Sequence, residues 1–229
     1  MIGNRFYDLP WNKEQLEVLI GGAGGIGSWL TLFLSRIGHD IYLFDDDRVE
    51  EVNLGGQLFS KENIGYKKSE AIKFNCKAFN SFDTVNNQGW YEYPDALPFM
   101  FSCFDNMKSR KDMFQAWKES SESELFIDGR MLAEQMDIFC ISKDDSHHIS
   151  RYENEFLFDD SEVEDQPCSA RATSHCGAMI ASYMTSLFTN YLTNKYMKHQ
   201  TRDVPFRLKI DLPILMQTID YNEPSVSLT

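Results

Sequence analysis

The stretch QLEVLIGGAGGIGSWLTLFLSRIGHDIYLFDDDRVEEVNLGGQ, residues 15–57, decides the fold of this chain. It opens with an apolar run at Leu16–Ile20 that is short enough to be a buried parallel strand. The glycine-rich segment GAGGIG follows at 22–27, and glycine allows both a sharp turn and the close approach of a ligand to the backbone. This order is typical of a phosphate-binding loop, and a glycine-rich structural turn is the alternative.

The segment after the loop has the spacing of a helix. Its apolar residues recur on one helical face: Ile26, Trp29, Leu30, Phe33, Leu34 and Ile37. Gly38 suits the left-handed residue that ends many helices. A second apolar run, Ile41–Phe44, then places Asp45 at its carboxyl end. This order predicts a βαβ unit in which the helix N-terminus meets phosphate and Asp45 meets ribose hydroxyls.

The rest of the chain alternates strand-like apolar runs with helical patterns. We expect helices at Lys67–Asn75, Lys108–Lys118 and Arg171–Tyr196. We expect further strands around Thr84–Val85 and at Leu97–Phe104, Leu125–Ile127 and Met136–Ser142, and edge strands at Phe206–Asp211 and Ile214–Thr218. The pattern predicts an α/β, Rossmann-like fold with a mostly parallel sheet, helices on both faces, and antiparallel strands in the C-terminal half. We expect one domain over residues 1–229, with an N-terminal arm at 1–14 and a flexible tail at 223–229.

Composition limits the partners and the compartment. The net charge of −13 disfavours a nucleic-acid surface or an anionic membrane as the main partner. Residues 1–9 do not resemble a signal peptide, and no apolar run approaches the roughly 20 residues that span a bilayer, so we expect a cytoplasmic protein. The five cysteines include no CxxC pair, so we expect free thiols and no zinc.

The interval 144–167 differs in composition from the rest of the chain. Its second half is rich in acids and holds no lysine or arginine after position 152: Glu153, Glu155, Asp159, Asp160, Glu162, Glu164 and Asp165. A solvated acidic loop is one interpretation. The other is a crossover loop above a substrate channel, since long loops in compact domains are often lids. The following cysteine, Cys168, precedes the long helix, whereas Cys103, Cys140 and Cys176 are expected to pack in the core.

Several short motifs occur in the order known from one family. They are GAGGIGS at 22–28, the run from Asp45 to Asn53, Gln57, GYKK at 65–68, and Asp105-Asn106 with Arg110. With these motifs the chain resembles the ThiF/MoeB/HesA adenylyltransferases, the superfamily of the ubiquitin-activating enzymes, over about Val18–Arg130. The resemblance implies that MgATP activates a carboxylate as an acyl-adenylate and that pyrophosphate leaves. In that family the carboxylate is usually the C-terminus of a ubiquitin-like or sulfur-carrier protein, and the enzymes are commonly homodimers.

The resemblance also implies the site residues. The glycine loop would hold ATP through its backbone: Gly22, Ala23, Gly24, Gly25, Ile26 and Gly27. Asp45 would bind the ribose, and Asp47 belongs to the same nucleotide site. Asn53, Gln57 and Lys68 would contact the phosphates, and Asp105 would hold magnesium. These roles agree with the chemistry, because attack of a carboxylate on a phosphate requires charge neutralisation.

Each of these residues has a simpler interpretation. Asp105 can cap the helix that follows it, and Lys68 can be a solvated surface lysine. Asn53 and Gln57 can be ordinary turn residues. Arg110 and Arg130 can form surface ion pairs.

One departure from the family pattern concerns catalysis. The family typically has Asn-Leu-x-Arg-Gln where this chain has Asn53-Leu54-Gly55-Gly56-Gln57, so the expected arginine is replaced by Gly56. Lys67, Arg110, or Arg5 from a partner's N-terminal arm could supply the missing charge. A non-catalytic nucleotide-binding homologue is the alternative, and an NAD-dependent oxidoreductase is a more distant one.

Two further groups of residues complete the sequence-based hypotheses. Some relatives use a cysteine after the crossover loop as an acyl acceptor, and Cys168 stands at that position, although a capping turn explains it equally. His147, His148 and His175 show no spacing typical of a metal site.

Overall fold

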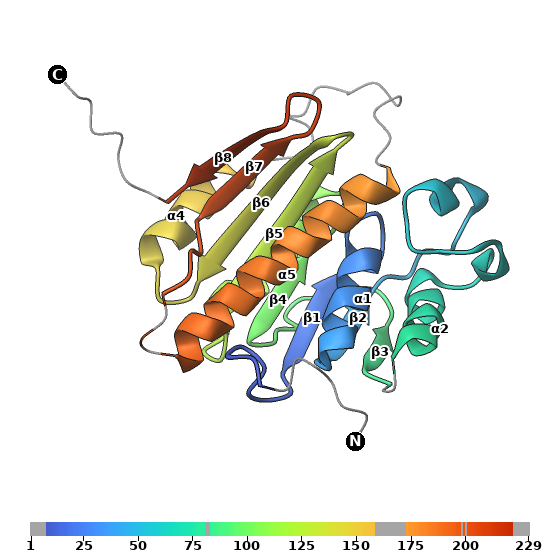
Figure 1. Ribbon diagram of the computed structural model, residues 1–229, viewed down its shortest axis with the longest axis horizontal. Helices are drawn as coiled ribbons and strands as arrows, with labels where there is room; N and C mark the ends of the chain where they lie inside the picture. Colours follow the sequence, from blue (N-terminus) through green and yellow to red (C-terminus); the bar gives the residue numbers. More distant parts are fainter. Residues whose placement is uncertain (1–7, 81–82, 159–172, 198, 200, 222–229) are drawn as a thin grey trace.

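The computed structural model describes residues 8–80, 83–158, 173–197, 199 and 201–221. The strands of this part form one eight-stranded sheet in the order β3-β2-β1-β4-β5-β6-β7-β8 (Figure 1). Their bounds are β1 Glu17–Gly21, β2 Asp40–Phe44, β3 Val85–Gln88, β4 Phe99–Ser102, β5 Leu125–Leu132, β6 Gln135–Ser142, β7 Arg207–Asp211 and β8 Met216–Asp220.

The sheet changes from parallel to antiparallel along its width. Strands β3, β2, β1, β4 and β5 pair in parallel, and β5 to β8 pair in antiparallel fashion. This confirms the predicted fold class. The chain runs outward from β1 to β3 on one side and from β4 to β5 on the other. The carboxyl ends of β1 and β4 therefore flank the point where open α/β sheets bind their ligands.

Helices cover both faces of the sheet. Their bounds are α1 Gly27–Ile37, α2 Lys68–Phe79, α3 Met107–Glu119, α4 Ser146–Glu155 and α5 Ser174–Tyr196, with short 3-10 helices at Glu51–Gly55 and Lys61–Asn63. The long helix α5 lies across one face beside α1 (Figure 1). Side chains of α3 and α4 pack in a second cluster with the opposite side chains of the strands.

The core follows the two-residue period of the strands. In β1, Val18 and Ile20 join the cluster that holds α1 and α5, whereas Leu19 joins the cluster that holds α3 and α4. In β5, Phe126 points away from its neighbours Leu125 and Ile127 in the same way. Both faces of the central strands are therefore buried, which explains why their sequences are continuously apolar.

Four details differ from the sequence-based predictions. The interval 144–167 is not a loop throughout, because α4 occupies Ser146–Glu155, with the Asp145 side chain accepting a hydrogen bond from the His148 N–H. The strand predicted at 206–211 is internal, since β8 pairs with its outer side and forms the edge. Burial of α1 extends beyond one face to Ser28, Thr31 and Ser35, because α1 lies between the sheet, α2 and α5. Helix α2 continues to Phe79, beyond the predicted end at Asn75.

Residues 1–7, 159–167 and 223–229 lie outside the described part, so the predictions for the arm, for most of the acidic segment and for the tail stay predictions. Within the described residues, no helix has the length and apolarity needed to cross a membrane.

Candidate functional site

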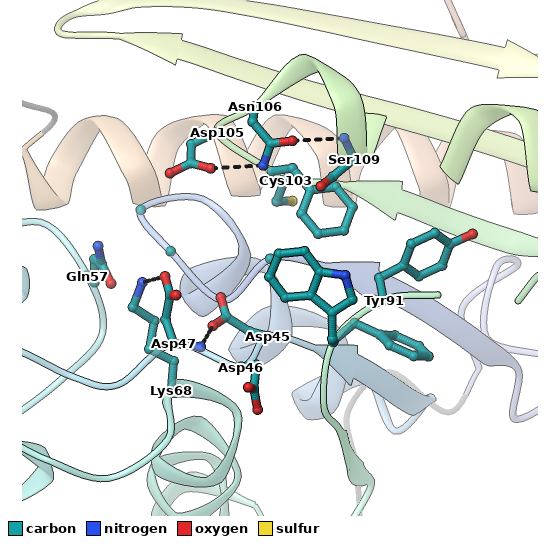
Figure 2. A pocket seen from close by; sticks show the side chains of 16 residues that line it. Asp45, Asp46, Asp47, Gln57, Lys68, Tyr91, Cys103, Asp105, Asn106 and Ser109 are labelled. Atoms are coloured by element: carbon teal, nitrogen blue, oxygen red, sulfur yellow. Dashed lines mark hydrogen bonds and ion pairs between the residues drawn. The ribbon is translucent and has the colours of Figure 1, made fainter. Parts of the chain in front are cut away.

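A cavity of about 390 Å³ opens at the carboxyl ends of β1, β2 and β4. It is lined by Gly22, Gly24, Gly25, Phe44, Asp45, Asp46, Asp47, Gln57, Lys68, Trp90, Tyr91, Cys103, Phe104, Asp105, Asn106 and Ser109. Figure 2 shows Asp105 and Asn106 on one side of this cavity and the three successive aspartates with Lys68 on the other. The cavity therefore combines segments that are far apart in the sequence.

The glycine loop forms one wall, and two of its glycines are required by geometry. Gly22 has φ +92°, and a Cβ there would lie 2.8 Å from the Cys103 carbonyl oxygen. A Cβ on Gly27 would lie 1.8 Å from the Gly22 carbonyl oxygen, so only glycine lets α1 start this close to β1. Gly22, Gly24 and Gly25 line the cavity, whereas Ala23, Ile26 and Gly27 are not among its lining residues.

Asp45 joins the tip of β2 to the glycine loop. One of its carboxylate oxygens accepts the Ala23 N–H at 2.7 Å and the other accepts the Asp47 N–H at 2.9 Å. Burial raises the pKa of Asp45 above its ordinary value, and these amide hydrogen bonds oppose the shift. Each carboxylate oxygen can accept further hydrogen bonds, which leaves capacity for ribose hydroxyls.

Lys68 is the first residue of α2 and lies inside the cavity wall. Its ammonium group contacts the Asp47 carboxylate at 2.8 Å, and its side chain is only 11% exposed. The interpretation of Lys68 as a solvated surface lysine is therefore wrong. Its neighbour Lys67 forms an ion pair with Asp46.

The cavity carries an excess of negative charge. Among the described residues that line it, Lys68 is the one lysine or arginine, whereas four carry carboxylates: Asp45, Asp46, Asp47 and Asp105. A nucleotide triphosphate entering such a cavity needs cations that accompany it or arrive from elsewhere.

Asp105 follows β4 and stands free of the helix cap. The N-cap of α3 is Asn106, whose side-chain oxygen accepts the Ser109 N–H at 2.8 Å. The interpretation of Asp105 as this cap is therefore wrong. Asp105 is exposed at the cavity, with the Asn106 side-chain nitrogen 3.4 Å from one of its oxygens (Figure 2).

Gln57 and Asn53 have different positions. Gln57 lines the cavity, and its side-chain oxygen is buried without a hydrogen-bond partner among the described residues. Because the two ends of an amide are assigned by their hydrogen bonds, this group can also present its NH₂ to a phosphate. Asn53 is not a lining residue, and its side-chain oxygen accepts the Glu50 N–H at 2.8 Å, which matches the role of a turn residue.

Arg110 lies behind the cavity wall. It is buried, it forms an ion pair with Asp128, and it donates hydrogen bonds to the carbonyl oxygens of Phe104 and Gly129. The interpretation of Arg110 as a surface ion-pair residue is therefore wrong, because its side chain is buried. Arg110 also does not line the cavity, so in this structure it is not placed to replace the missing arginine at the phosphates. Its contact with Phe104 instead holds the segment that carries Asp105.

Arg130 shares the buried carboxylate of Asp128 with Arg110. It donates a hydrogen bond to Asp128 at 2.6 Å and to the Tyr152 hydroxyl at 3.2 Å. Burial alone would raise the pKa of Asp128, but the two guanidinium groups hold it below its ordinary value. Arg130 is therefore part of a largely buried network that joins β5, α3 and α4.

The cavity also has an aromatic wall, which was not predicted from the sequence. Trp90 and Tyr91 lie after β3, between the strands predicted around Thr84–Val85 and at Leu97–Phe104, and Phe44 and Phe104 line the same cavity. Trp90 is 68% exposed although it lines the cavity. A Trp-Tyr pair directly after the third strand of a Rossmann-like unit was the available signal.

The cysteines divide into two groups. Cys103, Cys140 and Cys176 are buried, as expected for core residues, and Cys76 is buried as well. Burial raises the pKa of Cys140 to about 12. Cys168 and Arg5 lie outside the described residues, so their roles stay predictions.

Comparison with known proteins agrees with this architecture. The model of the ThiF family matches residues 12–219. Ubiquitin-like modifier-activating enzyme 5 of Dictyostelium discoideum is 29% identical over 52% of this chain and 39% of its own length. The match thus spans well under half of that relative.

Solved structures share the fold. PaaA has a TM-score of 0.69 at 18% identity, with 93% of this chain and 66% of PaaA covered. Escherichia coli MccB with ATP has a TM-score of 0.66 at 15% identity, covering 95% of this chain and 67% of MccB. MccB in complex with N-formylated MccA has a TM-score of 0.65 at 15% identity, again covering 95% of this chain and 67% of MccB. With a family model that matches nearly its whole length, this chain belongs to the ThiF family.

Proposed function

We propose that this chain is an ATP-dependent adenylyltransferase that activates a carboxylate at the C-terminus of a ubiquitin-like protein, a sulfur-carrier protein or a peptide. The observation that carries the proposal is the single cavity that joins the glycine loop to Asp45, Gln57, Lys68 and Asp105. Membership of the ThiF family supports it. The names of the relatives support it as well, since one activates a ubiquitin-like modifier and another binds ATP and MccA.

The chemistry needs charge neutralisation and no general base. A carboxylate oxygen of the substrate attacks the α-phosphorus, the bond to the bridging oxygen of the β-phosphate breaks, and pyrophosphate carries away the electron pair. Lys68 and the glycine-loop backbone that lines the cavity offset the charge that two approaching anions create. Asp45 holds the ribose and so fixes the position of the α-phosphate.

The donor set at the cavity fits magnesium. Asp105 offers an exposed carboxylate beside the glycine loop, and magnesium uses one or two carboxylates together with phosphate oxygens. When bound, magnesium would neutralise phosphate charge and favour the departure of pyrophosphate. Asp105 is the residue that would hold it.

The shortage of cations bears on the missing arginine at Gly56. Neither Lys67, which pairs with Asp46, nor Arg110, which pairs with Asp128, lines the cavity. Lys68 is the lining cation among the described residues, and it already contacts Asp47. A homodimer in which Arg5 enters the partner's site would supply a second one. The non-catalytic homologue is the alternative that the same shortage favours.

The test is pyrophosphate–ATP exchange with magnesium, with and without fractions that contain small proteins. The Asp105→Ala variant should lose exchange, because the metal-holding carboxylate is removed. The matched control is Asp112→Ala, since Asp112 lies on α3, pairs with Lys108 and lines no part of the cavity. Both variants remove one negative charge, so a general electrostatic effect would lower both rates equally.

The outcomes separate the candidate functions. Exchange that needs a protein fraction and Asp105 supports the proposal. ATP binding without exchange in any fraction supports the non-catalytic homologue, and Gly56→Arg should then restore exchange if the lost cation is the cause. Binding of NAD without binding of ATP would contradict both in favour of the oxidoreductase.

A further inference from the structure

Three side chains of metal-ligand type meet outside the nucleotide cavity. Glu134 lies in the turn between β5 and β6, and His175 and Cys176 lie in the first turn of α5. Their ligand atoms all lie within 4.8 Å of one another. The sequence spacing of His175 and of the cysteines indicated no metal site, because the third residue comes from a distant hairpin.

The separations suit a four-coordinate ion. His175 Nε2 lies 3.4 Å from Cys176 Sγ and 4.0 Å from Glu134 Oε1. Bonds of about 2.0–2.3 Å around a tetrahedral ion place neighbouring ligands roughly 3.5 Å apart. The longest separation, at most 4.8 Å, must shorten by about 1 Å to reach this value, and the side chains of Glu134 and His175 can move because they are 51% and 64% exposed.

The Thr173 hydroxyl contacts both ligands on α5, His175 and Cys176, and so can orient them. It lies 2.8 Å from His175 Nδ1 and 3.2 Å from Cys176 Sγ. A hydroxyl can accept one hydrogen bond and donate another. When it accepts the Nδ1–H, Nε2 keeps its lone pair, and when it donates to Sγ, it stabilises the thiolate that a metal binds.

We propose that Glu134, His175 and Cys176 bind a divalent ion of the zinc class. One thiolate, one imidazole and one carboxylate form a ligand set that zinc accepts, and magnesium and calcium prefer oxygen ligands alone. Three protein ligands leave one position for water or a small ligand. This site is separate from the magnesium site at Asp105, and the proposal is independent of adenylyl transfer.

The position of the site gives the ion a structural consequence. A Cβ on the next residue, Gly177, would lie 2.2 Å from the Gly25 carbonyl oxygen, so α5 touches the backbone of the glycine loop. A Cβ on Gly25 would lie 3.2 Å from Met131, which stands on β5. An ion between Glu134 and α5 therefore ties together the two elements that support this loop.

The test is metal binding by the whole chain, produced without a metal-affinity tag and stripped with a chelator. Cobalt is titrated first, and zinc affinity is then measured by competition with a chromophoric chelator, always without nucleotide. We expect one ion per chain, a thiolate-to-cobalt charge-transfer band, and the intense visible bands of tetrahedral cobalt.

Variants assign the ligands. Cys176→Ser should abolish the charge-transfer band, and His175→Ala should weaken zinc binding by roughly tenfold or more. Thr173→Val should weaken it by about tenfold through lost orientation, since Thr173 itself is not a ligand. The controls are His147→Ala, an exposed histidine on α4, and Cys140→Ser, a buried cysteine on β6. Both should bind as the wild type does.

Three results would overturn the proposal. The first is a wild-type chain that gives no charge-transfer band, and the second is a band that survives Cys176→Ser. The third is unchanged zinc affinity in His175→Ala, which stays informative if Cys176→Ser fails to fold, because His175 is exposed.

Discussion

The buried carboxylate of Asp128 should be among the most sensitive positions of the fold. Its side chain is 0% exposed, and it accepts hydrogen bonds from Arg110, Arg130 and the Tyr152 hydroxyl. The two arginine side chains are 8% and 17% exposed. Asp128→Asn keeps the size of the side chain and removes its charge, which leaves two largely buried guanidinium groups without their counter-ion.

The expected cost follows from burial. Removing one partner of a buried ion pair costs about 3–5 kcal/mol, because the remaining charge stays desolvated. The matched control is Asp137→Asn, since Asp137 on β6 also holds an arginine, Arg207, through two hydrogen bonds of 2.7 and 2.6 Å. That pair is 24% and 27% exposed, so its loss should cost less than about 1 kcal/mol.

Urea unfolding followed by tryptophan fluorescence measures both variants. The free energy of unfolding should fall several times further for Asp128→Asn than for Asp137→Asn, with a drop in Tm of roughly 6–20 °C for the former. The double variant Asp128→Asn/Arg110→Met should lose less free energy of unfolding than the sum of the losses in the two single variants. Equal, small losses in Asp128→Asn and Asp137→Asn would refute the argument from burial.

Three further predictions concern the nucleotide site and pH. Trp90→Ala should weaken ATP binding by about 1–3 kcal/mol, roughly 5–150-fold in Kd by calorimetry, if the exposed indole stacks on the base, and Trp90→Phe should retain most of the affinity. Gly177→Ala should weaken ATP binding, because its Cβ would lie 2.2 Å from the Gly25 carbonyl oxygen and would displace the glycine loop. Unchanged ATP affinity by calorimetry would show that the loop moves at no cost to binding. Burial lowers the pKa of His39 from 6.5 to about 4, so the unfolded chain takes up the proton at a higher pH than the folded chain does. The free energy of unfolding should therefore drop by about 3 kcal/mol as the pH falls from 6.5 to 4. Unfolding of His39→Gln across this range should lack that drop.

Local patterns in the sequence were sufficient to predict the fold class. The βαβ unit depends on contiguous signals: an apolar run, a loop whose glycines are sterically required, a helix ended by Gly38 at φ +103°, and Asp45 at the next strand end. The antiparallel strand β6 was also predicted, because Ile138–Ile141 form an uninterrupted apolar run. Helix α4 was missed because its ten residues, SHHISRYENE, are mostly polar and Tyr152 is the one buried among them, so the segment was assigned to the acidic loop that follows.

The site was less predictable, because it depends on contacts between distant segments. Asp105 could be placed at a sheet edge, but only the structure shows that Asn106 is the cap and that Asp105 is free of that role. Arg110 looked like a surface residue on a lysine-rich helix, and its partner Asp128 lies on another strand. Sequence spacing cannot detect such pairs, and the same reason hid the group formed by Glu134, His175 and Cys176.

The backbone contact between Gly177 and Gly25 has a thermodynamic consequence. Helix α5 begins at Ser174, and its first turn contacts the loop that would hold the nucleotide phosphates. Anything that displaces the start of α5 must then also displace that loop, since neither residue has a side chain to absorb the movement. Linkage is reciprocal, so a ligand that shifts one of these elements changes the affinity at the other by the same factor. In this chain the occupancy of the nucleotide site and the position of the first turns of α5 would therefore change together.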